Sequence, residues 1–301
     1  MKNRSISVVI SAYNEEQKLA RCLASVSWAD EIIVVDNTSQ DKTVSIAKKF
    51  TGKVYSRPND LMLNKNKNFG FSKATSEWIL NLDADEEVTD ELKIEIAERL
   101  GSENDIHGYW IPRKNIIFGK WITHGLWWPD KQLRLFRKDD GTFPCVHIHE
   151  YVEVNVKTAD LKNPYIHHNY DSVSQYLTKL ERCTTSEAEA LVDSRYHLSW
   201  YDAVRFPASD FIKIYFAQEG YKDGLHGLVL ALFQAFYSFV VFSKVWEKTG
   251  FFETPVPLDT IGNEGKRTMG DFSYWYHTSL IKKSSSPLVR FVHLLQRKFR
   301  V

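Results

Sequence analysis

The feature that most constrains the fold is an alternation of short apolar runs and amphipathic segments between residues 6 and 100. The runs at 6–10 and 31–36 are almost wholly apolar, which is typical of strands buried on both faces of a parallel sheet. We expect strands at 6–10, 31–36, 54–55 and 78–85, and helices at 15–26, 39–50, 64–74 and 89–100. Repeated strand–helix–strand units predict an α/β fold, with a mostly parallel sheet flanked by helices.

Polar side chains follow the ends of these expected strands. Tyr13 and Glu15 come after the first strand, Asp36 closes the second, and Asp83 and Asp85 close the fourth. Ligands of open parallel sheets bind beyond the carboxyl ends of the strands. We therefore expect the functional site at this edge.

The LDADEE segment at 82–87 is the sharpest local motif. If the strand continued to its end, Asp83 and Asp85 would point to one face, where two like charges need a cation between them. Mg²⁺ or Mn²⁺ would suit such oxygen ligands and could bridge to phosphates. The alternative is that this acidic segment, with Glu86, Glu87 and Asp90, caps the following helix.

The phosphate-binding motifs of two large enzyme classes are missing from the sequence. Neither GxGxxG nor GxxxxGK[ST] occurs, which argues against a dinucleotide enzyme and a P-loop NTPase. Lys67 is the point charge best placed for a diphosphate, although a solvated lysine is the alternative. Asp36 is suited to accept hydrogen bonds from a ribose or a base edge, unless it caps the turn in DNTSQDKT.

The composition and the cysteines limit the classes of partner and the cellular compartment that we expect for this protein. Lys and Arg number 39 against 38 for Asp and Glu, so the net charge of +1 provides no basic field for nucleic acid. Cys22, Cys145 and Cys183 form no CxxC pair, which disfavours a disulfide framework or a structural zinc site and indicates a reducing compartment. The N-terminus does not read as a signal peptide, so we expect a cytoplasmic protein.

The second half of the chain changes character, with short aromatic-rich β segments from about 105 to 170 and helices after 172. The charge-free stretch 224–243 approaches the ~20 residues of a membrane span, but polar residues interrupt it, and we favour a buried or interfacial helix. The segment 288–301 is a basic amphipathic helix of the kind that lies on anionic lipid, with an ordinary surface helix as the alternative.

Three blocks in the first half resemble the inverting family 2 glycosyltransferases, which have the GT-A fold. They are SVVISAYNEEQKLARCLASV, ADEIIVVDNTSQDKT and KNFGFSKATSEWILNLDADEE. WWPDKQLRLFRK, HIHEYVEV and YFAQEGYKDGLHG extend the similarity to the bacterial subgroup of lipopolysaccharide-core glucosyltransferases that act on heptose. The resemblance covers about residues 5 to 248, and it departs from the usual pattern at Ser11, where Pro is common, and at Asn37-Thr38-Ser39, where GST is common.

The resemblance implies a nucleotide-sugar site, made of Ser11, Ala12, Tyr13 and Glu15 around the base, Asp36 at the uracil or ribose, Lys67 at the diphosphate and Asp83 at the ribose. It also implies a divalent cation, Mg²⁺ or Mn²⁺, held by Asp83 and Asp85 with Asp85 as the principal ligand. Such an ion neutralises the departing nucleoside diphosphate.

An inverting transfer needs one general base on the acceptor side. Glu150 is the first candidate, because period-two spacing places this carboxylate on an apolar face with Val152 and Val154. A Glu paired with a nearby Arg is the alternative, and Asp130 is the second candidate for the base. Gln132 and Arg134 alternate with leucines and could face the acceptor or the donor phosphates, unless Arg134 forms a salt bridge.

The histidines at 147, 149, 167 and 168 raise the question of a metal-dependent hydrolase. HEYVE lacks the second His of HExxH, which excludes zinc-protease chemistry, and HxH falls mid-chain instead of on an early strand. His149 is more consistent with a role in orienting Glu150 or supporting the metal.

Together these features predict a GT-A catalytic domain at 1–170 and a helical acceptor- or membrane-associated region at 171–301. The expected reaction is inverting transfer from a nucleotide-sugar, such as a UDP-hexose, to a glycan or glycolipid acceptor. The acceptor would be lipopolysaccharide core or a cell-surface polysaccharide precursor, at the inner face of the cell membrane. A homo-oligomer is left open, as are two alternative functions, a nucleotidyltransferase and a non-catalytic sugar-nucleotide-binding scaffold.

Overall fold

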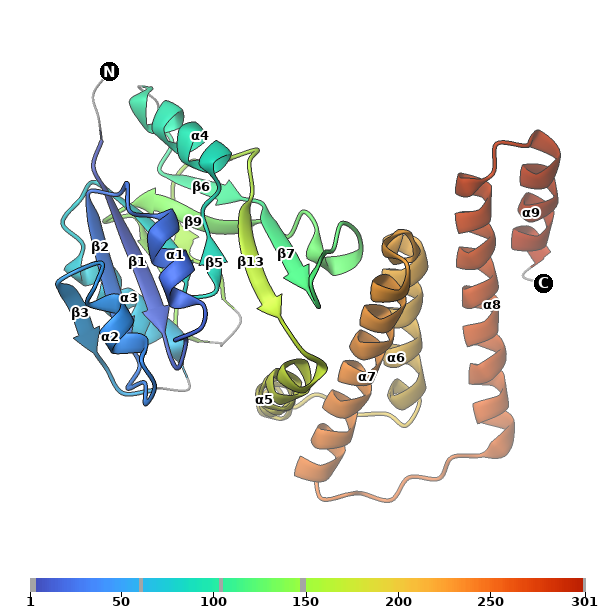
Figure 1. Cartoon of the computed structure of the whole chain (residues 1–301). Helices are drawn as coiled ribbons and strands as arrows, with labels where there is room; N and C mark the ends of the chain where they lie inside the picture. The colour runs from blue at the N-terminus through green and yellow to red at the C-terminus, as the bar shows by residue number, and fades with distance from the viewer. Residues whose placement is uncertain (1–3, 60–61, 103–104, 147–149, 300–301) are drawn as a thin grey trace. The chain divides into compact units, whose positions relative to one another are not determined.

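The computed structural model describes residues 4–59, 62–102, 105–146 and 150–299. The chain divides into two compact units, Met1–Ile117 with Trp128–Asn169, and Phe118–Trp127 with Tyr170–Val301. The first unit is an α/β unit, and the second is almost wholly helical (Figure 1).

The first unit follows the expected alternation of strands and helices. Its elements are β1 (Ile6–Ala12), α1 (Leu19–Ser25), β2 (Glu31–Asp36), α2 (Thr43–Ala47), β3 (Lys53–Ser56), α3 (Leu63–Lys73), β4 (Trp78–Asp83), β5 (Glu86–Glu87), α4 (Asp90–Gly101), β6 (Gly108–Ile111), β7 (Arg113–Ile117), β9 (Gln132–Arg137), β10 (Gly141–Thr142), β11 (Glu153–Val154), β12 (Thr158–Asp160) and β13 (Tyr165–Tyr170).

Seven strands form the central sheet in the order β12-β6-β9-β4-β1-β2-β3. β1 is parallel to β2 and β4, and β2 is parallel to β3, whereas β9 runs antiparallel to β4 and β6. The mostly parallel α/β sheet is therefore confirmed. The register places Ala12 beside Asp36 and Ser11 beside Asp83, so the carboxyl ends of three strands meet at one edge.

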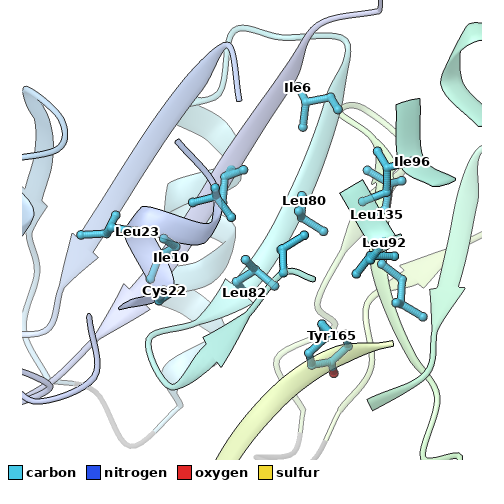
Figure 2. Packing of buried hydrophobic residues seen from close by; sticks show 14 of the residues in the cluster. Ile6, Ile10, Cys22, Leu23, Leu80, Leu82, Leu92, Ile96, Leu135 and Tyr165 are labelled. Carbon is cyan, nitrogen blue, oxygen red and sulfur yellow. The ribbon is translucent and has the colours of Figure 1, made fainter. Parts of the chain in front are cut away.

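Alternate residues of the central strands build two apolar layers, one on each face of the sheet. Ile10 and Leu82 pack with α1 and α4, in the cluster that Figure 2 shows. Val9 and Ile79 pack on the opposite face with Phe71 of α3. Because strand side chains alternate between faces, Asp83 of β4 lies on the face of Ile79, which is the face that α3 covers.

The structure shortens two of the expected strands near the site. β4 ends at Asp83, and Asp85 lies in the turn before β5, so the expected continuation of the strand pleat through both acids is wrong. Within the described residues the 147–154 segment is a strand only at Glu153–Val154, and Glu150 precedes it. Neither change removes Asp85 or Glu150 from the carboxyl-edge region.

The second unit is built of helices with aromatic contacts between them. Its elements are β8 (Lys120–Trp121), the 3₁₀ turn η1 (Gly125–Trp127), α5 (Val173–Asp193), α6 (Asp202–Ile212), the π-helical turn η2 (Lys213–Ala217), the 3₁₀ turn η3 (Gly220–Asp223), α7 (Leu225–Lys248), α8 (Leu258–Lys283) and α9 (Pro287–Phe299). Val241 and Val245 of α7 pack against Ala188 of α5. Phe216 of η2 meets Phe272 and Tyr276 of α8 edge-on.

Candidate active site

A pocket of about 270 Å³ lies in the first unit. It is lined by Asn64, Lys67, Asp83, Arg113, Asp130, Gln132, Leu133, Arg134, Phe143, Glu150, Tyr151 and Val152. The lining includes the two candidates for the general base, the first acid of the LDADEE segment, the lysine expected at the diphosphate, and two of the three polar residues of β9. The structure thus brings together residues that lie far apart in the sequence.

Asp83 lies between two cations. Lys67 Nζ is 2.6 Å from its Oδ1, and Arg134 Nη2 is 2.8 Å from its Oδ2. The same Arg134 nitrogen is 2.6 Å from Glu86 Oε1, and the backbone N–H of Asp83 donates to Glu86 Oε2 at 2.9 Å. The salt bridge considered for Arg134 is therefore present, and it belongs to a network of two cations and two carboxylates.

The network is largely withdrawn from water. The side chains of Arg134 and Glu86 are 6% and 0% exposed, whereas that of Asp83 keeps 34%. Burial acts to raise the pKa of Asp83, but the charges of Lys67 and Arg134 together lower it well below its usual range. Burial raises the pKa of Glu86 despite the opposing charge of Arg134.

Gly70 allows α3 to bring Lys67 close to the sheet. A Cβ at this glycine would lie 2.4 Å from Cγ1 of Val9 and 3.0 Å from Cγ2 of Val35. Lys67 precedes Gly70 by one helical turn, so the close approach of helix and sheet sets the distance between Lys67 and Asp83.

Asp85 faces a buried histidine on β13. His167 Nε2 is 3.4 Å from Asp85 Oδ2, and His167 Nδ1 is 2.7 Å from Asn115 Oδ1. Asn115 Nδ2 in turn donates to Asp130 Oδ2 at 3.1 Å. A continuous polar chain therefore joins Asp85 to the pocket residue Asp130.

Asp130 and Glu150 have different partners. Arg113 Nε donates to Asp130 Oδ2 at 2.8 Å, and Gln132 Nε2 donates to Oδ1 at 3.0 Å. Glu150 accepts hydrogen bonds from Asn64 Nδ2 at 3.1 Å, from the backbone N–H of Cys145 at 2.8 Å and from that of Val146. N–H donors of this kind favour the ionised carboxylate. His149, which we expected to orient Glu150, lies outside the described residues.

The loops after β1 and β2 are joined to each other. The backbone N–H of Asn14 donates to Ser39 Oγ, and that of Gln40 donates to Asn14 Oδ1, both at 2.8 Å. Asn14 and Thr38 have φ values of 54° and 60°, in the left-handed region that favours glycine. A β-branched residue held there is strained, and such strain is often found at ligand sites.

The residues expected around the base differ in exposure. Tyr13 is 41% exposed, whereas Ala12 and Asp36 are each 2% exposed. Asp36 accepts a hydrogen bond from the backbone N–H of Ser39 at 3.1 Å, as in the turn-cap alternative. Ser11 Oγ accepts from Asn37 Nδ2 at 3.1 Å.

Glu15 lies beside the acidic edge of the sheet. Burial, and after it the negative charge of Asp85, raise the pKa of Glu15 to about 7. The backbone N–H of Glu15 donates to Thr43 Oγ1 at 2.8 Å, which fixes the loop against α2.

The donor atoms at this edge fit a hard divalent cation that is completed by phosphate or water. Asp85 Oδ2 and His167 Nε2, which lie 3.4 Å apart, are oxygen and nitrogen donors of the kind that Mn²⁺ accepts. In the described part of the chain, no group of three or more His, Cys, Asp or Glu could hold a metal by itself. Mg²⁺ and Mn²⁺ often take only one or two protein carboxylates and fill the other positions with substrate oxygens and water.

Several residues of the network were not identified from the sequence. Arg113, Asn115 and His167 come from β7 and β13, which approach the site only through the sheet topology. The sequence pattern suggested His167 only as a metal ligand of a hydrolase, and Glu86 only as a cap of the following helix. A polar residue inside an aromatic β segment, such as Asn115 in RKNIIF, was the available signal.

The first unit thus combines a mostly parallel α/β sheet, an acidic carboxyl edge and a polar pocket. The model of glycosyl transferase family 2 matches residues 7–150. Over 256 residues the chain is 30% identical to an uncharacterized glycosyltransferase of Rickettsia typhi. This match covers 81% of this chain and 87% of that protein. The chain therefore belongs to glycosyl transferase family 2, and it is a glycosyltransferase, as the sequence predicted.

Two further similarities were found. The lipopolysaccharide core biosynthesis glycosyltransferase LpsC of Rhizobium meliloti is 25% identical over 252 residues, which is 81% of this chain and 92% of that protein. The crystal structure of residues 1–349 of S. aureus TarS in complex with UDP-GlcNAc is 17% identical, with a TM-score of 0.45 over 98% of this chain and 89% of that one.

Proposed function

We propose that this glycosyltransferase transfers a hexose from a UDP-sugar, with inversion, to a hydroxyl of a glycan or glycolipid, and that it needs Mg²⁺ or Mn²⁺. The observation that carries the proposal is the polar pocket in which Asp83, Lys67 and Arg134 lie with Glu150. The similarity to LpsC supports an acceptor in lipopolysaccharide core or a related cell-surface glycan.

We assign roles in this reaction to four residues of the pocket. Glu150 accepts the proton of the acceptor hydroxyl as its oxygen forms a bond to the anomeric carbon. The bond from that carbon to the phosphate oxygen breaks, and UDP leaves with the electron pair. Lys67 and Arg134 provide positive charge beside the departing diphosphate. Gln132 contacts the acceptor or the donor phosphates.

The base and the ribose of the donor would lie over the loops after β1 and β2. Tyr13 offers an exposed ring, Ser11 and Ala12 line the floor, and Glu15 and Asp36 provide polar contacts. Asp85, with Asp83 and His167 near it, would hold the divalent cation. When bound, that ion stabilises negative charge on the leaving diphosphate.

Asp130 is less suited to act as the base. Its carboxylate already accepts hydrogen bonds from Arg113, Asn115 and Gln132. A group with these partners is better suited to position Gln132, and we assign proton transfer to Glu150.

Calorimetric titration of UDP in the presence and absence of Mn²⁺ tests the donor and metal assignment. We expect binding with Mn²⁺, and a loss of at least about tenfold in affinity in Asp85→Asn, which is typical of a lost charge-assisted contact. Asp160→Asn, which changes an exposed carboxylate outside the pocket lining, is the matched control and should retain binding. Equal affinity with Mn²⁺ and with EDTA would contradict the metal dependence.

We further propose that the second unit holds the enzyme at the cytoplasmic face of the cell membrane. α7 is long and apolar enough to cross a bilayer by length and composition, and 22% of its most apolar window is buried. α9 exposes apolar residues, Leu288 at 73% and Phe291 at 57%, beside Arg290 and Arg297, which is the pattern of an interfacial helix.

Flotation with vesicles that contain phosphatidylglycerol tests this attachment. Replacing Leu288, Phe291 and Leu295 by Ser should reduce the floated fraction. Leu258→Ser is the control, because this α8 residue is 89% exposed and lies outside α9. Negligible flotation of the wild-type protein would contradict the membrane proposal and leave the catalytic one intact.

A further inference from the structure

A second pocket of about 560 Å³ lies in the helical unit, between α6 with η2 and α8. Its apolar lining includes Phe206, Ile212 and Trp275, and its polar lining includes Arg205, Lys213 and Arg267. We call it the α6–α8 pocket. Both apolar and cationic groups line one cavity, so its ligand needs both an apolar part and an anionic part.

The cations of the pocket are only partly neutralised. Arg205 Nε is 2.6 Å from Glu264 Oε2, and its guanidinium lies 4.0 Å from the centre of the Tyr201 ring. Arg267 Nη1 is 3.9 Å from the same Glu264 oxygen, at the limit of an ion pair. One carboxylate therefore serves two guanidinium groups, and Arg267 keeps N–H donors for another anion.

Lys213 adds to the positive charge. It is exposed, and no ion pair of Lys213 is recorded within the described ranges. Arg205, Lys213 and Arg267 give three positive charges, and Glu264 and Asp271 give two negative ones, so the pocket and its rim carry a net charge of +1. The charge of the pocket is complementary to that of an oxyanion.

The backbone at this place is also unusual. α6 passes at Lys213 into the π-helical turn η2, a rare conformation that is frequent at functional sites. The turn begins at Lys213, which therefore leaves the α-helical spacing of α6. Phe206, which lines the pocket, is 42% exposed, so part of the apolar lining faces solvent.

We propose that the α6–α8 pocket binds one anionic membrane phospholipid, with the phosphate at Lys213 and Arg267 and the adjoining acyl chain along Phe206 and Trp275. The charges account for the phosphate, and the apolar wall accounts for the chain. A soluble phosphate compound would leave that wall without a partner. The inference rests on the membrane attachment proposed above, and it adds a defined lipid site to the non-specific attraction of α9.

Titration with dihexanoyl-phosphatidylglycerol, below its micelle concentration, tests the proposal on the full chain without a membrane. Intrinsic fluorescence of Trp275 reports on the pocket, and Trp275→Phe identifies its share of the signal. We expect saturable binding of one lipid per chain. Lys213→Gln/Arg267→Gln should weaken it by at least about tenfold, as the loss of charge-assisted contacts does.

The matched control is Lys266→Gln/Lys283→Gln, which removes the same charge from exposed positions outside both the pocket lining and α9. It should change the affinity by less than about twofold, because exposed charges in water contribute little. Equal weakening in both variants would overturn the proposal in favour of general electrostatic attraction. If glycerol phosphate bound as tightly as the lipid, the proposal would be overturned in favour of a soluble phosphate ligand.

Further results distinguish a failure of the lipid site from a failure of the membrane attachment or of the catalytic function. The lipid site would be refuted, and the membrane attachment kept, if two results were found together: Lys213→Gln/Arg267→Gln binds phosphatidylglycerol vesicles as well as the wild type does, and the short-chain lipid does not bind. Loss of UDP-sugar turnover in the pocket variant is not expected, because its residues lie in the second unit.

Discussion

Removal of Arg134 provides the sharpest test of the buried network. In Arg134→Met the side chain keeps much of its volume and loses its charge, which leaves Glu86 without its cation. Glu86 is fully buried, whereas Asp83 is a third exposed and keeps Lys67, so the effect falls mainly on Glu86. Breaking a buried ion pair by removing one partner costs about 3–5 kcal/mol, and we expect a loss of unfolding free energy in that range.

Protonation of Glu86 should limit this loss at low pH. Without Arg134 the pKa of Glu86, which burial already raises, should rise further. A carboxyl group with a raised folded-state pKa contributes stability below its unfolded pKa and loses it as the pH rises. The deficit of Arg134→Met should therefore be larger at pH 8 than at pH 5.

Urea unfolding of the first unit, followed at both pH values, measures these differences. Arg134→Met/Glu86→Gln should recover part of the loss, with a coupling energy of about 0.5–3 kcal/mol, as for neighbours in one network. Arg137→Met is the control on the same strand, where no ion pair to a carboxylate is recorded in the described chain. A deficit under about 1 kcal/mol, no larger than an ordinary hydrogen bond, would refute the reasoning.

Three further predictions follow from particular contacts. Glu31 accepts hydrogen bonds from Lys53, Ser7 and Thr75, which outweigh burial and lower its pKa to about 2. Glu31→Gln should therefore remove stability that the wild type has above pH 4.5 and loses as the pH falls towards 2. Urea unfolding at pH 7 and pH 3 measures this deficit, and equal deficits at the two pH values would contradict the reasoning. Burial and Asp85 raise the pKa of Glu15 to about 7, so wild type should lose stability relative to Glu15→Gln as the pH rises from 4.5 through 7, and a constant difference across that range would exclude the shift. Gly70→Ala should destabilise the protein by about 1–3 kcal/mol, as overpacking does, and should raise the KM for the donor by moving Lys67; an unchanged melting temperature and KM would show that the helix adjusts without effect.

Most of the α/β unit could be predicted from the sequence. The runs at 6–10 and 31–36 are apolar on both faces, which identified two central strands and placed Asp36 at the end of one. Two helices were predicted too long at their N-termini, since α1 begins at Leu19 instead of Glu15 and α2 begins at Thr43 instead of Ser39. The polar loop residues there bond to the neighbouring loop, and local spacing contains no information on that pairing.

The contacts between the side chains of the site could not be predicted in the same way. Ion pairs such as Arg134 with Glu86 join segments 48 residues apart, through the antiparallel insertion of β9 beside β4. His167 reaches Asp85 from a strand that follows the catalytic candidates in the chain. Motif spacing identified single residues, and the contacts between them depend on the order of strands.

Release of UDP from UDP-sugars is the most direct test of the central claim, that the carboxyl-edge pocket performs metal-dependent glycosyl transfer. Wild type, Glu150→Gln and Asp130→Asn would be compared with a panel of UDP-hexoses and a glycan acceptor, with Mn²⁺ or EDTA. We predict turnover with one donor in Mn²⁺, loss of transfer by a factor of about 10²–10⁴ in Glu150→Gln, and a smaller loss in Asp130→Asn. Full activity of Glu150→Gln, or no turnover with any donor and no UDP binding, would contradict the account.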